Sequence, residues 1–152
     1  MGGGGFLGMS LCQSLLSQGH NVSSLDLYAT KNDHKLNTGN FKQIIGDYSD
    51  HTTIEKSLMN IDVVFHLIST TTPMISNNNA VLDITENVLP TIEFLNITRQ
   101  SGVKKIIFFS SGGTIYGPTD LIPISEDHAC NPICSYGIQK LAIEKYLHLF
   151  YK

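Results

Sequence analysis

The chain has 152 residues, enough for one domain with a hydrophobic core, and 41% of them are hydrophobic against 15% charged. The formal net charge of −3 provides no basic surface for nucleic acid, and no apolar run is long enough to cross a membrane. The sequence has no basic-then-apolar pattern typical of a signal peptide. Its three cysteines, an odd number, do not indicate a disulfide framework. A cytoplasmic protein is therefore the default expectation.

The first stretch with a chemical signature is the glycine-rich segment at residues 2–8, GGGGFLG. Gly2, Gly5 and Gly8 have the spacing of a dinucleotide-binding loop, whose glycines allow a tight turn and a close approach of the pyrophosphate. A helix predicted over residues 6–18 would direct its first N–H groups at the phosphates. A flexible glycine tail is the alternative, whereas a Walker loop is excluded because no Lys-Ser/Thr pair follows.

A short strand predicted over residues 21–27 carries Asp26 near its end. An acid at this distance from the glycines is expected to bind the adenosine ribose hydroxyls, which favours NAD over NADP. The alternative is an ordinary turn aspartate. Residues 29–40 are polar and aperiodic, which predicts a surface loop, and residues 41–45 form a second strand that is followed by Gly46-Asp47.

The middle of the chain predicts a helix over residues 52–59 and then a buried parallel strand over residues 62–68, which are almost continuously apolar. His66 lies inside that strand, and we expect a hydrogen-bonded core histidine rather than a ligand. The polar residues 69–79 form a loop at the carboxyl end of the strand, the edge at which such sheets bind ligands.

A long helix is predicted over residues 80–100, with Pro90 expected to kink or split it. Another buried strand is predicted over residues 103–109, and a last helix runs from Ser135 to the C-terminus. Strands and helices therefore alternate along the chain, which predicts a parallel α/β sheet, and no linker marks a second domain.

Tyr136 and Lys140 are four residues apart on the last predicted helix, so they share one face. A phenol with a pKa near 10 becomes a base near neutral pH only if a positive charge stabilises the phenolate. Lys140 and an oxidised nicotinamide would supply that charge and make Tyr136 a general acid/base. The Tyr-x-x-x-Lys motif is common by chance, but its combination with the glycine loop and Asp26 is specific.

Together these features resemble the extended short-chain dehydrogenase/reductase family, which includes NAD-dependent nucleotide-sugar epimerases and dehydratases. The resemblance extends from Gly2 to the last helix. The matching segments are residues 2–8, Asp26, 46–47, 65–68, 87–88, 110–117, and Tyr136 with Lys140. The resemblance implies a Rossmann-type, doubly wound parallel sheet.

The resemblance also implies roles for residues that match the family motifs. Those implied to contact NAD are Gly2, Gly5, Phe6, Leu7, Gly8 and Asp26 at the pyrophosphate and ribose, Asp47 and Tyr48 beside the adenine, and Leu67, Ile68, Ser69, Asn87 and Ser110 along the rest of the cleft. Lys140 would hold the nicotinamide ribose while Tyr136 exchanges a proton with a sugar hydroxyl. The implied substrate is a nucleotide sugar, a UDP-hexose, epimerised at C4 through a keto intermediate.

The sequence departs from the family pattern inside the catalytic segment. Gly112 stands where the family has its catalytic Ser or Thr, so Ser111 or Thr114 must hydrogen-bond the substrate oxygen, with Ser111 slightly favoured. Gly112 and Gly113 offer none of the acids typical of the dehydratases, which favours an epimerase. Pro90 replaces a glycine that is frequent in the family.

The sequence departs from the family at both ends as well. In the family an apolar central strand precedes the glycine loop, and only Met1 represents it here, so the facing strand edges are expected to lose backbone partners. The family's last sheet strands and C-terminal substrate domain have no counterpart in residues 1–152. We expect a partial NAD-binding domain with little or no activity of its own.

Three other interpretations remain beside the epimerase. One is a dehydratase or reductase of the same family, and another is a non-catalytic NAD-binding module. A metal protein built on Cys130, Cys134 and His128 is disfavoured because the spacing is poor for zinc, and no metal is expected. The resemblance also suggests a homodimer formed through the helices at residues 80–100 and 136–150.

Overall fold

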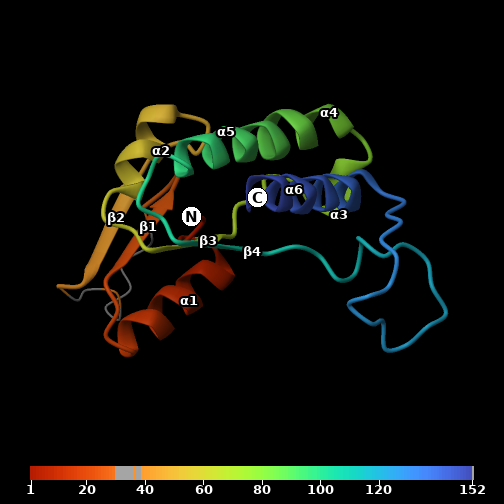
Figure 1. Cartoon of the computed structure of the whole chain (residues 1–152), viewed down its shortest axis with the longest axis horizontal. Helices are drawn as coiled ribbons and strands as arrows, with labels where there is room; N and C mark the ends of the chain where they lie inside the picture. The colour runs from red at the N-terminus through yellow and green to blue at the C-terminus, as the bar shows by residue number, and fades with distance from the viewer. Residues whose placement is uncertain (30–35, 37–38, 152) are drawn as a thin grey trace. The chain divides into compact units, whose positions relative to one another are not determined.

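The computed structural model describes residues 1–29, 36 and 39–151 and contains parallel strands and helices in alternation (Figure 1). In chain order the elements are α1 (Phe6–Ser17), β1 (Val22–Asp26), β2 (Phe41–Ile45), α2 (His51–Leu58), β3 (Val63–His66), α3 (Pro73–Ser76), α4 (Ala80–Asp83), the π-helix η2 (Ile84–Val88), α5 (Leu89–Thr98), β4 (Lys105–Phe108) and α6 (Ser135–Tyr151). The predicted α/β fold is confirmed. The loop predicted over residues 29–40 lies mostly outside the described residues.

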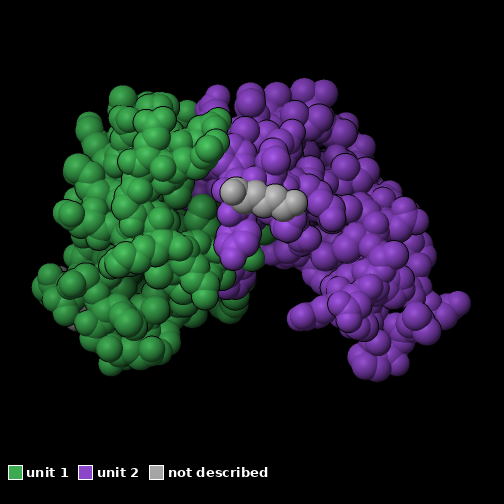
Figure 2. Space-filling model, viewed as in Figure 1, with its two compact units in different colours: residues 1–68, 96–108 green, residues 69–95, 109–152 purple. Residues whose placement is uncertain are grey.

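The chain divides into two compact units, residues 1–68 with 96–108 and residues 69–95 with 109–152 (Figure 2). Within the described ranges, no helix combines the length and the apolar content needed to cross a bilayer.

The first unit contains both strand pairs. β1 pairs in parallel with β2, from Val22 opposite Phe41 to Asp26 opposite Ile45. β3 pairs in parallel with β4 in the same manner. α1 and α2 lie on opposite sides of β1 (Figure 1), and Cys12 of α1 is buried with Val22 in a small apolar cluster.

Between β1 and β3, the first two residues of the chain occupy the position of a strand. The Met1 nitrogen donates to the Phe65 carbonyl at 2.9 Å, and the Met1 carbonyl accepts from the Leu67 N–H at 3.1 Å. On the other side, the Gly2 N–H donates to the Leu25 carbonyl at 2.8 Å. These residues therefore pair with β1 and β3 at once, as the central strand of a doubly wound sheet does.

Beyond Met1, the space between β1 and β3 is a cavity of about 620 Å³ lined by both strands, α1 and α2. Ser24 is 1% exposed, and its Oγ has no hydrogen-bond partner among the described residues. Burial lowers the pKa of the Met1 amino group to about 6. The structure thus confirms a Rossmann-type arrangement of parallel strands, in which Met1 and Gly2 pair between β1 and β3.

Extending the chain ahead of Met1 by about four apolar residues should fill this space, since a strand rises roughly 3.3 Å per residue. Each new backbone hydrogen bond contributes about 1 kcal/mol, and a chain of this size gains roughly 2–4 °C in midpoint per kcal/mol. We therefore expect a Val-Ile-Val-Ile extension to raise the thermal unfolding midpoint by at least about 5 °C. A Gly-Ser-Gly-Ser extension is the control, and an equal rise with it would contradict this account of the cavity.

The second unit is built around the helices that precede and follow β4 in sequence. α4, η2 and α5 follow one another directly, so the predicted long helix is split by a π turn at residues 84–88. Pro90 causes this, because it has no N–H to donate to the preceding turn. α6 packs against α3, α4 and η2.

Candidate functional site

The glycine loop adopts a backbone shape that larger residues would not tolerate. Gly2 has a φ of +76°, in the left-handed region, and a Cβ there would lie 3.1 Å from the Ile68 nitrogen. A Cβ at Gly8 would collide with the Gly2 carbonyl oxygen. The predicted need for glycine at these two positions therefore has a direct structural reason, namely a tight turn packed beneath the first turn of α1.

The N-terminus of α1 presents unpaired donors beside this loop. Gly5 is the N-cap, no described side chain caps the helix, and its first backbone bond runs from Met9 N–H to the Gly5 carbonyl at 2.9 Å. The N–H groups of Phe6, Leu7 and Gly8 precede that bond and carry the positive end of the helix dipole. The Phe6 side chain is 89% exposed. This geometry fits an anionic phosphate group.

Asp26, the last residue of β1, lies against the same loop. Its Oδ2 accepts a hydrogen bond from the Gly4 N–H at 2.9 Å, and its backbone carbonyl accepts one from Gly46 at 3.0 Å. The carboxylate is thereby fixed beside the glycines, with Oδ1 left to accept hydroxyl donors. Asp47 follows Gly46 and is exposed, and its Oδ1 accepts from the Ser49 N–H at 2.7 Å.

Tyr48 and His66 form a buried polar pair. Tyr48 is 6% exposed, and its hydroxyl lies 2.7 Å from Nε2 of His66, which is 2% exposed. The expectation that His66 is a hydrogen-bonded core histidine is confirmed. The contact of Tyr48 with adenine stays a prediction, and the structure places its ring in the core. Leu67 and Ile68 lie next to Gly2, and their contact with the cofactor stays a prediction.

In the second unit, Asn87 holds the loop that follows β3. It is 5% exposed, its Oδ1 accepts from the Thr70 N–H at 2.9 Å, and its Nδ2 donates to the Thr70 hydroxyl at 2.9 Å. Ser69 donates from its hydroxyl to the Thr71 carbonyl at 3.2 Å. The roles of Asn87 and Ser69 toward the cofactor stay predictions.

Tyr136 and Lys140 share a face of α6, as predicted. The Lys140 ammonium lies 5.6 Å from the Tyr136 ring centroid and donates to the Phe109 carbonyl at 3.1 Å. Lys140 is 4% exposed, and this burial lowers the pKa of its amine to about 8. Most Lys140 side chains are still charged at neutral pH, so a cation lies beside the Tyr136 ring.

Ser111 and Thr114 are the two candidates for the missing catalytic hydroxyl. Thr114 lies under the first turn of α6, where a Cβ on Gly137 would come within 2.5 Å of the Thr114 carbonyl oxygen. The Thr114 hydroxyl is buried, and within the described part of the chain it has no hydrogen-bond partner. The Ser111 carbonyl caps the turn that leads to Thr114, and Ser110 is exposed. The role of either hydroxyl toward a substrate stays a prediction; the Thr114 hydroxyl is enclosed by protein, whereas Ser111 is half-buried.

One buried acid escaped the sequence reasoning. Asp83 is 1% exposed and lies one helical turn before Asn87. An acid on a helix face that ends in a motif asparagine is the signal that could have drawn attention to it. Across the described residues, no group of three His, Cys, Asp or Glu side chains could hold a metal ion.

Apolar side chains on the two helices proposed for dimer contacts remain exposed. Val81 and Ile84 are 64% and 60% exposed, and Ile138 and Leu149 of α6 are 55% and 62% exposed. A second copy of the chain could cover these exposed side chains, and the homodimer stays a prediction.

Comparison with known proteins places the chain in a family. Residues 1–151 match the NAD dependent epimerase/dehydratase family, and the chain belongs to it. Among its relatives, the UDP-glucose 4-epimerase of Mycolicibacterium smegmatis is 32% identical over 98% of this chain and 49% of its own length. The dTDP-4-dehydro-6-deoxyglucose reductase of Escherichia coli is 34% identical over 99% of this chain and 49% of its own.

Solved structures agree with this assignment. The UDP-glucose 4-epimerase of Thermotoga maritima with UDP-glucose matches with a TM-score of 0.86 and 32% identity, over 98% of this chain and 49% of that one. The Thermus thermophilus UDP-glucose 4-epimerase complex with NAD matches with a TM-score of 0.87 and 30% identity, over the same shares. The chain spans about half the length of the relatives it matches.

The lowered pKa of Lys140 predicts a pH dependence of stability. The folded amine titrates near 8 and the unfolded one near 10.5, so the unfolded chain binds more protons between these values. The contribution of Lys140 to the free energy of unfolding therefore rises with pH from about 8 to 10.5. Compared with Lys140→Met, the wild-type unfolding midpoint should gain steadily over this range. Lys145→Met, at an exposed position of α6, is the control; a constant wild-type-to-Lys140→Met difference would contradict the assignment.

Proposed function

We propose that residues 1–152 are the NAD-binding portion of a nucleotide-sugar 4-epimerase that acts on a UDP-hexose. The observation that carries the proposal is the presence, in one chain, of a tight glycine loop beside Asp26 and of Lys140 next to Tyr136 on α6. Family membership and the similarity to UDP-glucose 4-epimerases support it.

The residues of the first unit fit the adenosine half of a dinucleotide. The turn at Gly2 leaves room for backbone approach, and the uncapped start of α1 offers N–H donors to a pyrophosphate. Asp26 keeps one carboxylate oxygen for the ribose hydroxyls. When bound, NAD would accept a hydride from C4 of the sugar and return it to the opposite face of the keto intermediate.

The chain's own residues would manage the proton. Tyr136 as phenolate takes the proton of the C4 hydroxyl as the carbonyl forms, and gives it back as the alcohol is restored. The Lys140 ammonium would stabilise the phenolate and would hold the nicotinamide ribose. Ser111 or Thr114 would hydrogen-bond the same substrate oxygen.

This span by itself would have little or no turnover. The relatives are about twice as long as this chain. The family resemblance implies that the substrate domain follows the Tyr/Lys helix. We therefore assign residues 1–152 to a partial NAD-binding domain, and the activity to a chain that includes the remainder.

A reductase is the second candidate, because the dTDP-sugar reductase matches at 34% identity. The two differ in redox balance: a reductase consumes one reduced nicotinamide for each sugar, whereas an epimerase leaves the oxidised and reduced cofactor unchanged after turnover. A pure NAD-binding module would have no need of the Tyr136 phenol, so the third interpretation depends on that residue being dispensable.

Binding of NAD can be tested directly on this chain. A ligand that binds only the folded state raises the unfolding midpoint, by about 2.7 kcal/mol when its concentration is 100 times its Kd. We expect excess NAD to raise the midpoint and Gly2→Val to abolish that rise, because valine is strained at a φ of +76° and would crowd Ile68. Gly102→Val is the control, since a Cβ there meets nothing within 4 Å. No NAD effect on the wild-type chain would refute the binding proposal.

The role of Tyr136 can be tested in a chain lengthened to the span of its relatives. Removing the phenolic hydroxyl by Tyr136→Phe should lower the rate of UDP-glucose epimerisation by at least about 10²-fold, the usual contribution of a general acid/base. NAD binding should persist. Tyr151→Phe, at a residue 89% exposed, is the matched control. Undiminished turnover in Tyr136→Phe would rule out the acid/base assignment.

A further inference from the structure

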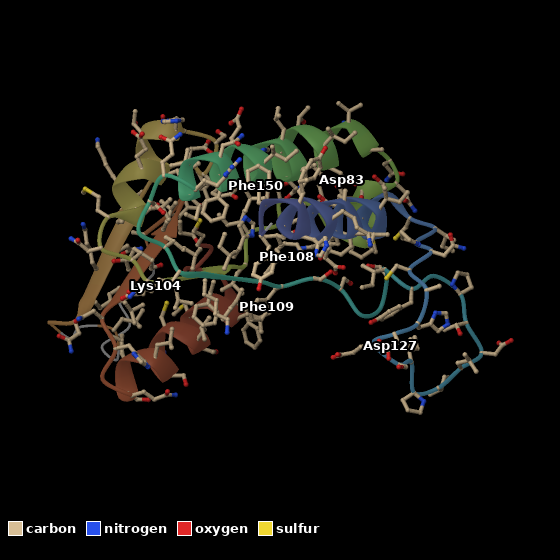
Figure 3. The ribbon with its side chains drawn as sticks, viewed as in Figure 1. Asp83, Lys104, Phe108, Phe109, Asp127 and Phe150 are labelled. Atoms are coloured by element: carbon tan, nitrogen blue, oxygen red, sulfur yellow. The ribbon has the colours of Figure 1, made fainter. Side chains whose placement is uncertain are left out.

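Asp83, the last residue of α4, carries a buried carboxylate in the second unit (Figure 3). Its side chain is 1% exposed, and among the described residues it forms no ion pair with a lysine, arginine or histidine. A carboxylate removed from water without a cation is costly unless hydrogen bonds replace its hydration. The donors around Asp83 therefore explain why an acid is tolerated here.

Four side-chain donors reach the two carboxylate oxygens. Oδ1 accepts from the Thr71 hydroxyl at 2.6 Å and from Nε2 of Gln139 at 3.0 Å. Oδ2 accepts from the hydroxyls of Ser76 and Ser135. A carboxylate has about four lone-pair sites, so Asp83 is saturated by groups from three segments: the loop after β3, the end of α3, and α6.

Two of these donors belong to α6 and lie one turn apart. Ser135 is its first residue and Gln139 is four residues later, so both project from the same helix face. Each immediately precedes a residue of the proposed site, Tyr136 and Lys140. Successive residues of an α-helix are about 100° apart, so holding the first pair at one point fixes the direction of the second pair.

Gln139 leaves one buried polar atom unpaired among the described residues, which indicates that its contact with Asp83 serves to orient α6. Its Nε2 donates both to Asp83 and to the Thr71 hydroxyl at 2.8 Å, while its buried Oε1 has no partner within the described residues. A side chain selected only for burial would be apolar and would leave no unpaired carbonyl oxygen. The start of α6 is held further by Asn77, whose Oδ1 accepts from the Ser135 N–H at 2.9 Å.

We propose that Asp83 is a positioning residue that sets the rotation of α6 about its axis and thereby the directions of the Tyr136 phenol and the Lys140 ammonium. The inference rests on the proposed function for the meaning of those two directions, but the rotation itself is a property of this chain that can be measured without turnover.

The titration of Lys140 provides the measurement. Lysine labelled with ¹³C at Cε gives one signal per residue, and Lys140→Met identifies the signal of Lys140. The wild-type signal should show its inflection near pH 8, because the amine is buried. If Asp83→Ala releases α6, Lys140 gains contact with water, and its inflection should move upward by about one pH unit or more.

Matched variants distinguish the effect of the Asp83 hydrogen bonds from a general loss of packing. Asp83→Asn keeps the size and one acceptor oxygen, and the Ser76 and Ser135 hydroxyls can accept from its amide, so the inflection should stay near the wild-type value. Ser135→Ala combined with Gln139→Met cuts only the α6 side while conserving volume beside Lys140, and it should reproduce the shift. Asp120→Ala, an exposed acid of the same unit, should leave the titration unchanged.

A wild-type Lys140 inflection in both Asp83→Ala and the α6 double variant would overturn the proposal, even if their unfolding midpoints fall, because Asp83 would then stabilise the unit without orienting α6. Should Asp83→Ala fail to fold, the double variant decides alone. A different result would contradict the proposed function, namely full epimerisation by Tyr136→Phe in the lengthened chain. That result is independent of the Lys140 titration.

Discussion

The backbone pairing of Met1 and Gly2 is the constraint on which the first unit depends. Three hydrogen bonds join these residues to β3 on one side and β1 on the other, so two separate strand pairs share one central position. The same position is where the glycine turn begins and directs the start of α1. A cavity of about 620 Å³ continues from it between the strands. The glycine turn and the pairing of the strands therefore depend on the same residues, because Met1 and Gly2 take part in both.

The second unit is organised by buried hydrogen bonds rather than by a sheet. Asn87 and Asp83, one turn apart on the helix before β4, bind successive threonines of the loop that follows β3. Asp83 also reaches α6, which carries the Tyr136 and Lys140 side chains. Polar groups in such places are costly unless each finds its partner, so they specify one arrangement of loop and helices where apolar packing would tolerate several.

The electrostatic feature of the candidate site is the moderately lowered pKa of Lys140. Lys140 is buried enough for its pKa to fall to about 8, yet it remains mostly protonated at neutral pH. The Lys140 ammonium lies 5.6 Å from the centroid of the Tyr136 ring. The Thr114 hydroxyl is buried and has no hydrogen-bond partner among the described residues. The chain belongs to the epimerase/dehydratase family, and these residues lie in segments that resemble the motifs of that family.

The sequence by itself determined the order and type of the strands and long helices, the glycine turn, the place of Asp26, and the shared face of Tyr136 and Lys140. These depend on local periodicity and spacing, which tertiary contacts did not override. Tertiary structure alone decided that Tyr48 pairs with His66, that the Thr114 carbonyl lies against Gly137 of α6, and that Asp83 gathers donors from three segments. Those contacts join residues far apart in the chain, and no local pattern encodes which distant hydroxyl or amide will meet a given side chain.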